Sequence, residues 1–282
     1  MPARAARRTV TLKCGQPIGN STTLNISPDN PLAIAVVEAI HEGDVASLKR
    51  VLEANPGLAT ARIGDPKSCD GISRTLLHVA TDWPGHFPNG AATIAALVEA
   101  GADVNARFTG PHTETPLHWA ASSDDVAVLD ALLDAGADIE APGAVIGGGA
   151  PLADAVAFGQ WKTARRLVER GARTTLWQAD ALGLMDRVEK HFADDGPSAL
   201  APWLPRPPRP DVPPPNEITH AFWSACHGGQ RESAEYLLAR GAALNWIGYD
   251  GLTPIDAARR SEAGALVEWL ANRGAKSAND LG

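Results

Sequence analysis

The side chains that could carry out chemistry or recognition in this chain of 282 residues are acids, histidines and tryptophans. Tryptophan accounts for eight of the fifteen aromatic residues, and there are eight histidines. A carboxylate packed against tryptophan loses hydration, which raises its pKa and suits it to general acid–base catalysis. Aromatic and acidic residues together are also typical of a protein-binding hot spot. Which of the two applies depends on the elements that bring these residues together.

Composition narrows the classes of partner. The formal net charge of −8 argues against nucleic acid or an anionic membrane surface as the main partner. Cys14, Cys69 and Cys226 form no CxxC pair, and their odd number argues against a disulfide framework, so we expect a reducing, cytoplasmic location. No apolar run approaches the length of a membrane span. The residues define no oligomeric state.

The most regular element is the stretch from Thr115 to Gly136. Thr115 is a good N-cap, and Pro116 suits the first helical position because no backbone N–H is needed there. After a short turn, apolar residues recur at helical spacing until Gly136, which suits a left-handed helix end. The stretch therefore predicts a pair of short helices, which cannot bury its apolar face without neighbouring copies.

Copies of this pair recur along the chain. The 21 positions from Thr115 to Gly136 also separate Ala150 from Gly171, His220 from Gly241 and Thr253 from Gly274. The surrounding residues agree, since the Thr-Pro-Leu opening returns as Ala-Pro-Leu and Thr-Pro-Ile, and the closing Gly-Ala pair recurs. Divergent copies complete the series, which gives units starting near residues 34, 75, 115, 150, 174, 220 and 253.

The Thr-Pro-Leu-His-x-Ala-Ala opening and the Gly-Ala-Asp-Val-Asn closing resemble the ankyrin repeat, in particular bacterial-type ankyrin repeat domain proteins. The resemblance implies an all-α fold, an ankyrin-type α-solenoid of about seven helix-hairpin repeats with short β-turn fingers. We expect a flexible basic arm at residues 1–30, a single repeat domain at 31–277 and a C-terminal tail at 278–282. A proline-rich strap at 201–216 would lie inside that domain as extended polyproline-type chain, with an SH3-type ligand as the alternative.

The resemblance also divides scaffold residues from variable ones. It implies that His78 and His118, in the Thr-Pro-Leu-His position, are structural and bond the backbone of adjoining turns. Trp177, Trp223 and Asp256 occupy that position in later units, which we interpret as altered core packing. The variable positions that follow would face the concave surface, so that Trp119, Asp154 and Gln178 would be near neighbours.

Two uses of that concave surface follow. The first is binding of a protein or peptide partner by the groove and fingers, with these expected binding residues: Asp82, Trp83, His112, Trp119, Phe158, Gln178, Trp246, Tyr249 and Asp250. The alternative is a small-molecule-binding or acid–base enzyme in a closed pocket walled by Trp83, Trp119 and Trp246. Asp154 would then be the catalytic acid or base, with His86 or His227 as its partner.

We expect no cofactor and no metal. The neighbouring His220, Cys226 and His227 lack a zinc spacing, because on one helix they point in different directions. No phosphate-binding or nucleophile-elbow pattern is present, and Gly147-Gly148-Gly149 fits a flexible finger better than a phosphate cradle. The preferred function from sequence is therefore a binding scaffold.

Overall fold

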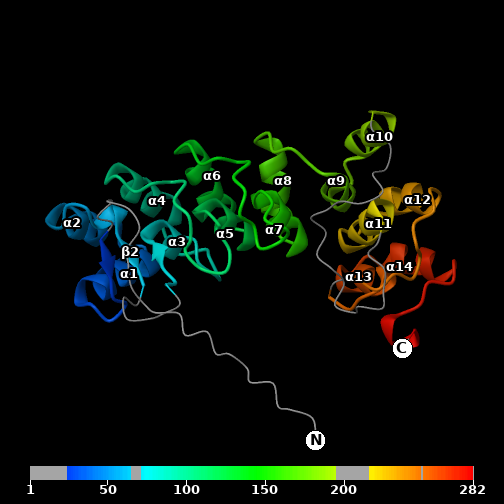
Figure 1. Cartoon of the computed structure of the whole chain (residues 1–282), viewed down its shortest axis with the longest axis horizontal. Coiled ribbons are helices and arrows are strands. Elements are labelled where there is room, and N and C mark those ends of the chain that lie inside the picture. The colour runs from blue at the N-terminus through cyan, green and yellow to red at the C-terminus, as the bar shows by residue number, and fades with distance from the viewer. Residues whose placement is uncertain (1–23, 65–70, 195–215, 249, 282) are drawn as a thin grey trace, which may run out of the picture.

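The computed structural model describes residues 24–64, 71–194, 216–248 and 250–281. Fourteen α-helices lie within these residues, arranged as successive pairs along the long axis of the molecule (Figure 1). The first helices of the pairs are α1 Pro31–Glu42, α3 Leu76–Ala80, α5 Pro116–Ser122, α7 Pro151–Ala157, α9 Leu176–Leu182, α11 Glu217–His227 and α13 Pro254–Arg260. The second helices are α2 Val45–Ala54, α4 Gly90–Glu99, α6 Val126–Asp134, α8 Trp161–Glu169, α10 Met185–Asp194, α12 Arg231–Leu238 and α14 Gly264–Ala271. The predicted all-α class is confirmed.

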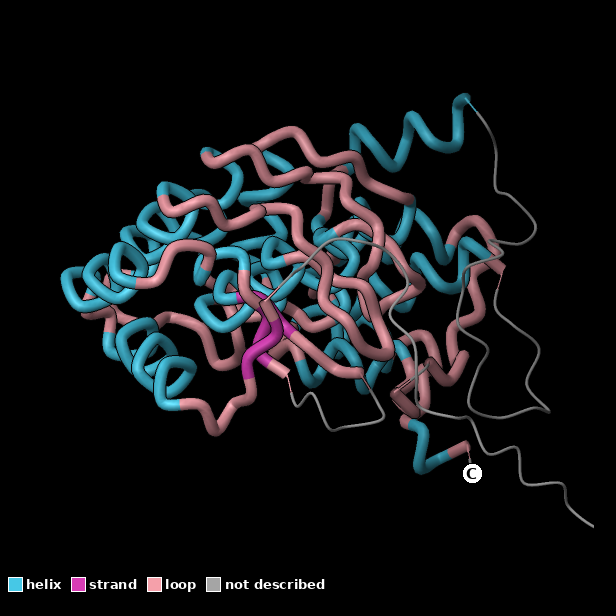
Figure 2. Tube along the Cα trace, turned by 60° about the vertical axis from the view of Figure 1, so that its left-hand side comes forward, coloured by secondary structure: helices cyan, strands magenta, loops and turns pink. Residues whose placement is uncertain are grey.

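A small sheet lies near the N-terminal end of the described chain, in the order β1 Asn25–Ile26, β2 Arg62–Ile63 and β3 Arg74–Thr75 (Figure 2). β1 pairs with β2 in parallel, and β2 pairs with β3 antiparallel. The strand β1 falls inside the arm that was expected to be flexible, so that expectation is wrong for Asn25 and Ile26. Residues 1–23 of the predicted arm and residues 201–215 of the predicted strap lie outside the described residues, and the division into arm, domain and tail stays a prediction.

The first helices begin at side-chain caps that also join one repeat to the next. The His78 and His118 rings accept at Nδ1 from the backbone N–H of Thr75 and Thr115, at 3.4 and 3.0 Å. Their Nε2 atoms lie 3.2 and 3.3 Å from the carbonyl oxygens of Glu114 and Gly149, in the next repeat. Burial lowers the pKa of His78 to about 3 and that of His118 to about 4, so both rings are neutral near pH 7. The predicted structural role of these histidines is confirmed.

The interpretation of Trp223 and Asp256 as packing replacements is wrong. The Trp223 indole Nε1–H donates to the Leu252 carbonyl oxygen at 3.0 Å, just before the next cap, which is the bond that the histidines make. Asp256 accepts from the Thr253 hydroxyl at 2.8 Å and from the Ala278 N–H at 2.8 Å. Both substitutes therefore keep a polar function, because a buried carbonyl or N–H without a partner is costly.

The register of α9 differs by one residue from the sequence expectation. Thr175, rather than Thr174, caps the helix, and the Gln178 side-chain oxygen accepts from the Thr175 N–H at 2.9 Å. Gln178 therefore takes the capping position that was assigned to Trp177. The shift frees the Trp177 ring from any capping role, and this has consequences for the site described below.

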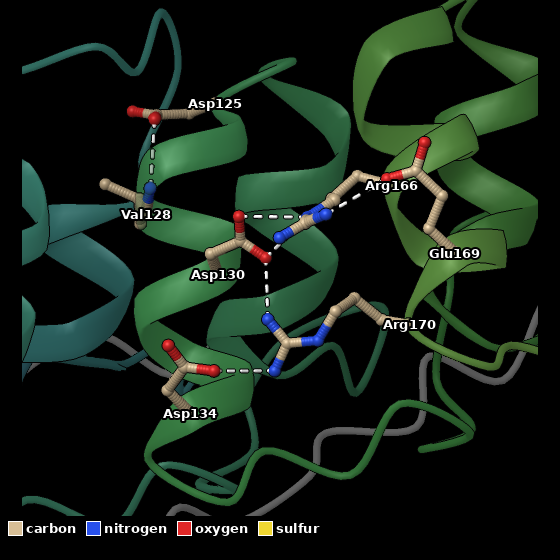
Figure 3. Close-up of polar contacts among 7 residues, drawn as sticks. All are labelled: Asp125, Val128, Asp130, Asp134, Arg166, Glu169 and Arg170. Atoms are coloured by element: carbon tan, nitrogen blue, oxygen red, sulfur yellow. Dashed lines mark hydrogen bonds and ion pairs between the residues drawn. The ribbon is translucent and has the colours of Figure 1, made fainter.

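An ion-pair network joins the second helices α6 and α8 on the outer side of the array (Figure 3). Arg166 Nε and Arg170 Nη1 lie 2.8 and 2.7 Å from the Asp130 carboxylate, and Arg170 also reaches Asp134 at 2.6 Å. Burial raises the pKa of Asp130, but the two arginines more than offset it and hold the pKa below its usual value. Such exposed pairs contribute little net stability, so they align the helices more than they stabilise the fold.

Gly228 marks a close approach between α11 and α9. A Cβ atom built on Gly228 would lie 1.8 Å from the carbonyl oxygen of Ala181 and 2.7 Å from its carbon. The backbone of Gly228 is right-handed helical, with φ −82°, so any residue could adopt it locally. The glycine is required by the neighbouring backbone and not by its own conformation.

We predict that Gly228→Ala destabilises the protein by about 2–4 kcal/mol, because the added methyl group forces α11 away from α9. The measurement is urea unfolding followed by circular dichroism at 222 nm. Gly264→Ala is the matched control, since a Cβ there would meet nothing within 4 Å. Equal unfolding free energies for the two variants would contradict the close approach.

Candidate functional site: an aromatic groove between α7, α9, α11 and α13

A groove with a volume of about 960 Å³ lies between four successive first helices and the loops that precede them. Helix α11 supplies His220, Trp223, Ser224 and His227, while α9 supplies Trp177 and Gln178. The small residues Ala153 and Ala157 of α7 leave room beside them, and Phe158 follows at the end of that helix. The volume falls in the range of sites that bind a small molecule or a few side chains of a peptide.

Aromatic rings form one wall of the groove. The His227 ring lies 5.4 Å from the Trp223 ring and 5.0 Å from the Trp161 ring, and the Trp177 ring lies 5.5 Å from that of His220. Phe158 is 47% exposed although it is a large apolar side chain, which leaves its ring available to an incoming ligand. The geometry offers flat apolar surface of the kind that dominates binding energies.

His227 is held as a neutral ring by two hydrogen bonds. Its Nε2 lies 3.1 Å from the Val156 carbonyl oxygen, which only an N–H can satisfy, and its Nδ1 lies 3.1 Å from Arg260 Nη2, which only an unprotonated nitrogen can accept. Burial is the main reason that the pKa of His227 is lowered, and the Arg260 charge adds to it. Burial also lowers the pKa of His220 to about 4. Both histidines are therefore uncharged near pH 7.

The charged groups at the rim are paired with one another. Arg260 bonds the Asp250 carboxylate as well as His227. Across the groove, Arg173 lies 3.4 Å from Glu140, which also accepts the Arg173 backbone N–H at 2.7 Å. Each arginine thus faces an acid, and the lining has no net charge from these four residues. The groove can bind apolar groups, and its two rim arginines are already matched by acids.

The structure places only part of the predicted site in this groove. His227, Phe158, Gln178 and Asp250 line it. Trp246 is buried behind it, with its ring 6.4 Å from that of His220. His112 is exposed on an earlier finger, and Tyr249 lies outside the described residues.

The expected closed pocket walled by Trp83, Trp119 and Trp246 is wrong. Trp119 packs instead against the rings of His78, at 4.9 Å, and Phe108, at 5.3 Å. Trp83 is 79% exposed, on the loop between α3 and α4. The three tryptophans belong to separate repeats, and none of them lines the groove.

The inserted loop between α3 and α4 lies across helix ends and not in the groove. His86 donates its backbone N–H to Asp125 at 2.8 Å, and its ring Nε2 lies 3.1 Å from the Ser123 carbonyl oxygen. Asn89 donates to the Gly43 carbonyl oxygen at 2.9 Å, and Asp82 forms an ion pair with Arg74. The insertion falls at the ends of the helices, so the His86 backbone N–H and the Asn89 side chain bond the turns of the two neighbouring repeats.

The Asp154 carboxylate has a structural role, because it holds the loop that precedes α7. Its side chain is fully buried and accepts the backbone N–H groups of Val145 and Ile146, at 3.2 and 3.0 Å. Burial raises the pKa of Asp154 to about 7, against the opposing effect of these bonds. The expected pKa shift is present, but the carboxylate holds the loop before α7 and does not line the groove. The proposed catalytic set of Asp154, His86 and His227 is therefore spread over a buried loop anchor, a helix-end loop and the groove.

Three aromatic side chains of the groove were not predicted as binding residues: Trp177, His220 and Trp223. The sequence does mark two of them, since large indole rings replace the capping histidine in two successive units. This replacement was interpreted as core packing, because the one-residue shift of α9 and the hydrogen bond of Trp223 are not visible in the sequence.

No group of three His, Cys, Asp or Glu side chains in the described residues could hold a metal ion. Within the same residues, no helix is long and apolar enough to cross a membrane.

Comparison with known proteins identifies the repeat. The family model for ankyrin repeats (three copies) matches residues 29–143. A crystal structure of the human ASB11 ankyrin repeat domain is similar at 20% sequence identity, with a TM-score of 0.46, over 86% of this chain and 97% of that one. No curated protein matches the sequence.

Residues 29–143 therefore match ankyrin repeats, and the described part of the chain continues the same all-α array of helix pairs. Ankyrin repeats generally act as scaffolds for protein–protein interaction. The matched residues include the most regular repeats, whereas most of the groove lies in the pairs that follow them.

Asp180 on α9 is a second buried acid close to the groove wall. Neither of its carboxylate oxygens has a hydrogen-bond partner among the described residues. The Ser233 hydroxyl lies nearby and lowers the pKa in part, but that hydroxyl bonds Met185 Sδ at 3.3 Å. Burial dominates and raises the pKa of Asp180 to about 8. The folded protein therefore holds this proton between about pH 4 and pH 8, where the unfolded chain has lost it, so stability falls as pH rises through that range.

We predict that Asp180→Asn removes this loss of stability, because the amide has the shape of the protonated acid and does not ionise. Between pH 5 and pH 9 the unfolding free energy of the wild type should fall by at least about 2 kcal/mol more than that of the variant. The measurement is urea unfolding at pH 5, 7 and 9. Asp186→Asn, at an exposed position on α10, is the control and should follow the wild type. Parallel pH profiles for Asp180→Asn and the wild type would refute the assignment.

Proposed function

We propose that this protein binds a segment of a partner protein in the aromatic groove between α7, α9, α11 and α13. The observation that carries the proposal is the exposed Phe158 ring beside the wall of Trp177 and Trp223, in a hollow of about 960 Å³. Large exposed apolar side chains that border a concave surface are typical of binding sites. The general use of ankyrin repeats as interaction scaffolds supports the same function.

The specificity of the groove would come from shape and apolar contact. Its two histidines are neutral near pH 7, and Arg173 and Arg260 are each paired with an acid. Because each arginine already has an acid partner, the groove offers a charged ligand little unmatched charge. An uncharged segment with one or two bulky apolar side chains matches its aromatic lining better.

Acid–base catalysis has less support than binding. Asp154 is directed at two backbone N–H groups, and the ring nitrogens of His227 are both used in hydrogen bonds. A general base must reach the proton that it removes, and neither group faces an open position in the groove. A location in the cytoplasm belongs to the same proposal and rests on the cysteine pattern alone.

We predict that Phe158→Ala weakens partner binding at least ten-fold with little effect on folding, because the ring is half-exposed and its removal leaves no buried cavity. Peptides selected from a random display library on the wild-type protein would be measured by fluorescence anisotropy against both proteins. Thermal unfolding checks that the variant remains folded.

Trp83→Ala is the matched control, because Trp83 is an even more exposed aromatic residue outside the groove. It should leave the affinity unchanged. Selected peptides that bind Phe158→Ala as tightly as the wild type, or that lose affinity only in Trp83→Ala, would rule out the groove as the binding site.

A further inference from the structure

The hydrogen-bonding groups of the groove are unevenly used. Its carboxylates, its side-chain amide oxygen and one imidazole nitrogen already accept hydrogen bonds from the protein itself: Glu140, Asp250, Gln178 Oε1 and His227 Nδ1. A ligand N–H that entered the groove would have to compete with these bonds. A buried N–H without an acceptor is costly, so the groove disfavours an occupant with many donors.

The donors of the same lining are not used up. Gln178 holds the Thr175 N–H with its oxygen, so the Nε2 end of the amide is left for the groove. A guanidinium has five N–H groups, and Arg173 and Arg260 use only some of theirs on their acid partners and on His227. These two side chains are 83% and 43% exposed, so their other N–H groups can be reached. The rim is therefore balanced in charge but has donors to spare.

Proline-rich chain has the complementary balance. Proline supplies a carbonyl oxygen but no backbone N–H. In the polyproline II conformation the carbonyl groups make no hydrogen bonds within the chain, so they are free to accept from a binding site. An ordinary extended peptide brings one N–H with nearly every carbonyl, and the groove has few acceptors left for it.

The shape and the rings of the groove fit the same kind of chain. Polyproline II repeats about every 9 Å, and packed helices lie about 8–10 Å apart. The first helices α7, α9, α11 and α13 pack against one another in succession, so each turn of the ligand would meet one repeat of the protein. Phe158 and Trp223 offer flat rings at different repeats, and aromatic-lined grooves are a recurrent site for proline-rich segments.

We propose that the partner segment recognised by this groove is a proline-rich chain in the polyproline II conformation. Its rings pack on Phe158 and Trp223, and its carbonyl oxygens accept from Gln178 and from the rim arginines Arg173 and Arg260. This inference rests on the proposed function, since it requires the groove to bind a segment of a partner protein. It adds the chemical class of that segment and the donors that select it.

The first test uses the peptides that a random display library yields on the full-length wild-type protein. Their sequences should be enriched in proline at least about three-fold over the unselected library. The tightest peptide is then synthesised with a fluorescein label, beside a version in which every proline is replaced by alanine, which restores the backbone N–H groups. Fluorescence anisotropy should show at least about ten-fold weaker binding of the alanine version.

The second test changes the donor in the groove. Gln178→Glu keeps an oxygen for the Thr175 N–H, as in an ordinary capping box, but replaces the amide NH₂ by a second oxygen. We expect it to bind the proline-rich peptide at least about ten-fold more weakly than the wild type. Gln160→Glu, the same change at a residue that does not line the groove, is the matched control and should bind as the wild type. Thermal unfolding checks that both variants are folded, and the alanine version of the peptide tests the inference without any variant.

The outcomes separate this inference from the proposed function. Selected peptides that need Phe158 but show no enrichment in proline, or that bind equally well with alanine in place of proline, would overturn the inference and leave the groove a peptide-binding site. Equal binding by folded Gln178→Glu and the wild type would overturn the inferred recognition of carbonyl groups. Selected peptides that bind independently of Phe158 would remove the proposed function and the inference together.

Discussion

The hydrogen bond from the first helix of one repeat to the carbonyl just before the next cap is the contact on which the array depends. His78, His118 and Trp223 each make it, to Glu114, Gly149 and Leu252. The bond pairs a donor with an acceptor that are at least partly buried, and either group alone would be costly to leave unpaired. It therefore determines how each finger sits on the preceding helix, and the spacing of successive repeats follows from it.

The groove forms where this contact is modified. In the fourth repeat, Ala153 stands where the histidine ring would be, and the empty volume beside it becomes part of the hollow. Asp154 then holds the finger in place through Val145 and Ile146. In the fifth repeat, Gln178 caps the helix and the Trp177 ring is free to line the wall. The groove thus forms in the two repeats where the next residue along the helix, Asp154 or Gln178, makes the structural hydrogen bonds.

Electrostatics limits what the groove can do. Burial keeps His220 and His227 neutral, and the arginines at the rim are matched by Glu140 and Asp250. The buried acids near the groove, Asp154 and Asp180, have raised pKa values because they are desolvated, and neither lines the hollow. The raised pKa values of these two acids therefore result from burial within the scaffold, and the groove itself is suited to apolar contact.

The sequence by itself determined the helix pairs, because caps and turns depend on residues three or four positions apart. Thr115 and His118 illustrate this, and their roles were predicted correctly. Only the tertiary structure decided which tryptophans line the groove. Contacts with residues of another repeat direct Trp119 into a packed cluster, whereas Trp83 stays exposed on the inserted loop. The groove arises from contacts between repeats and from a one-residue shift in α9, and no local pattern encodes either.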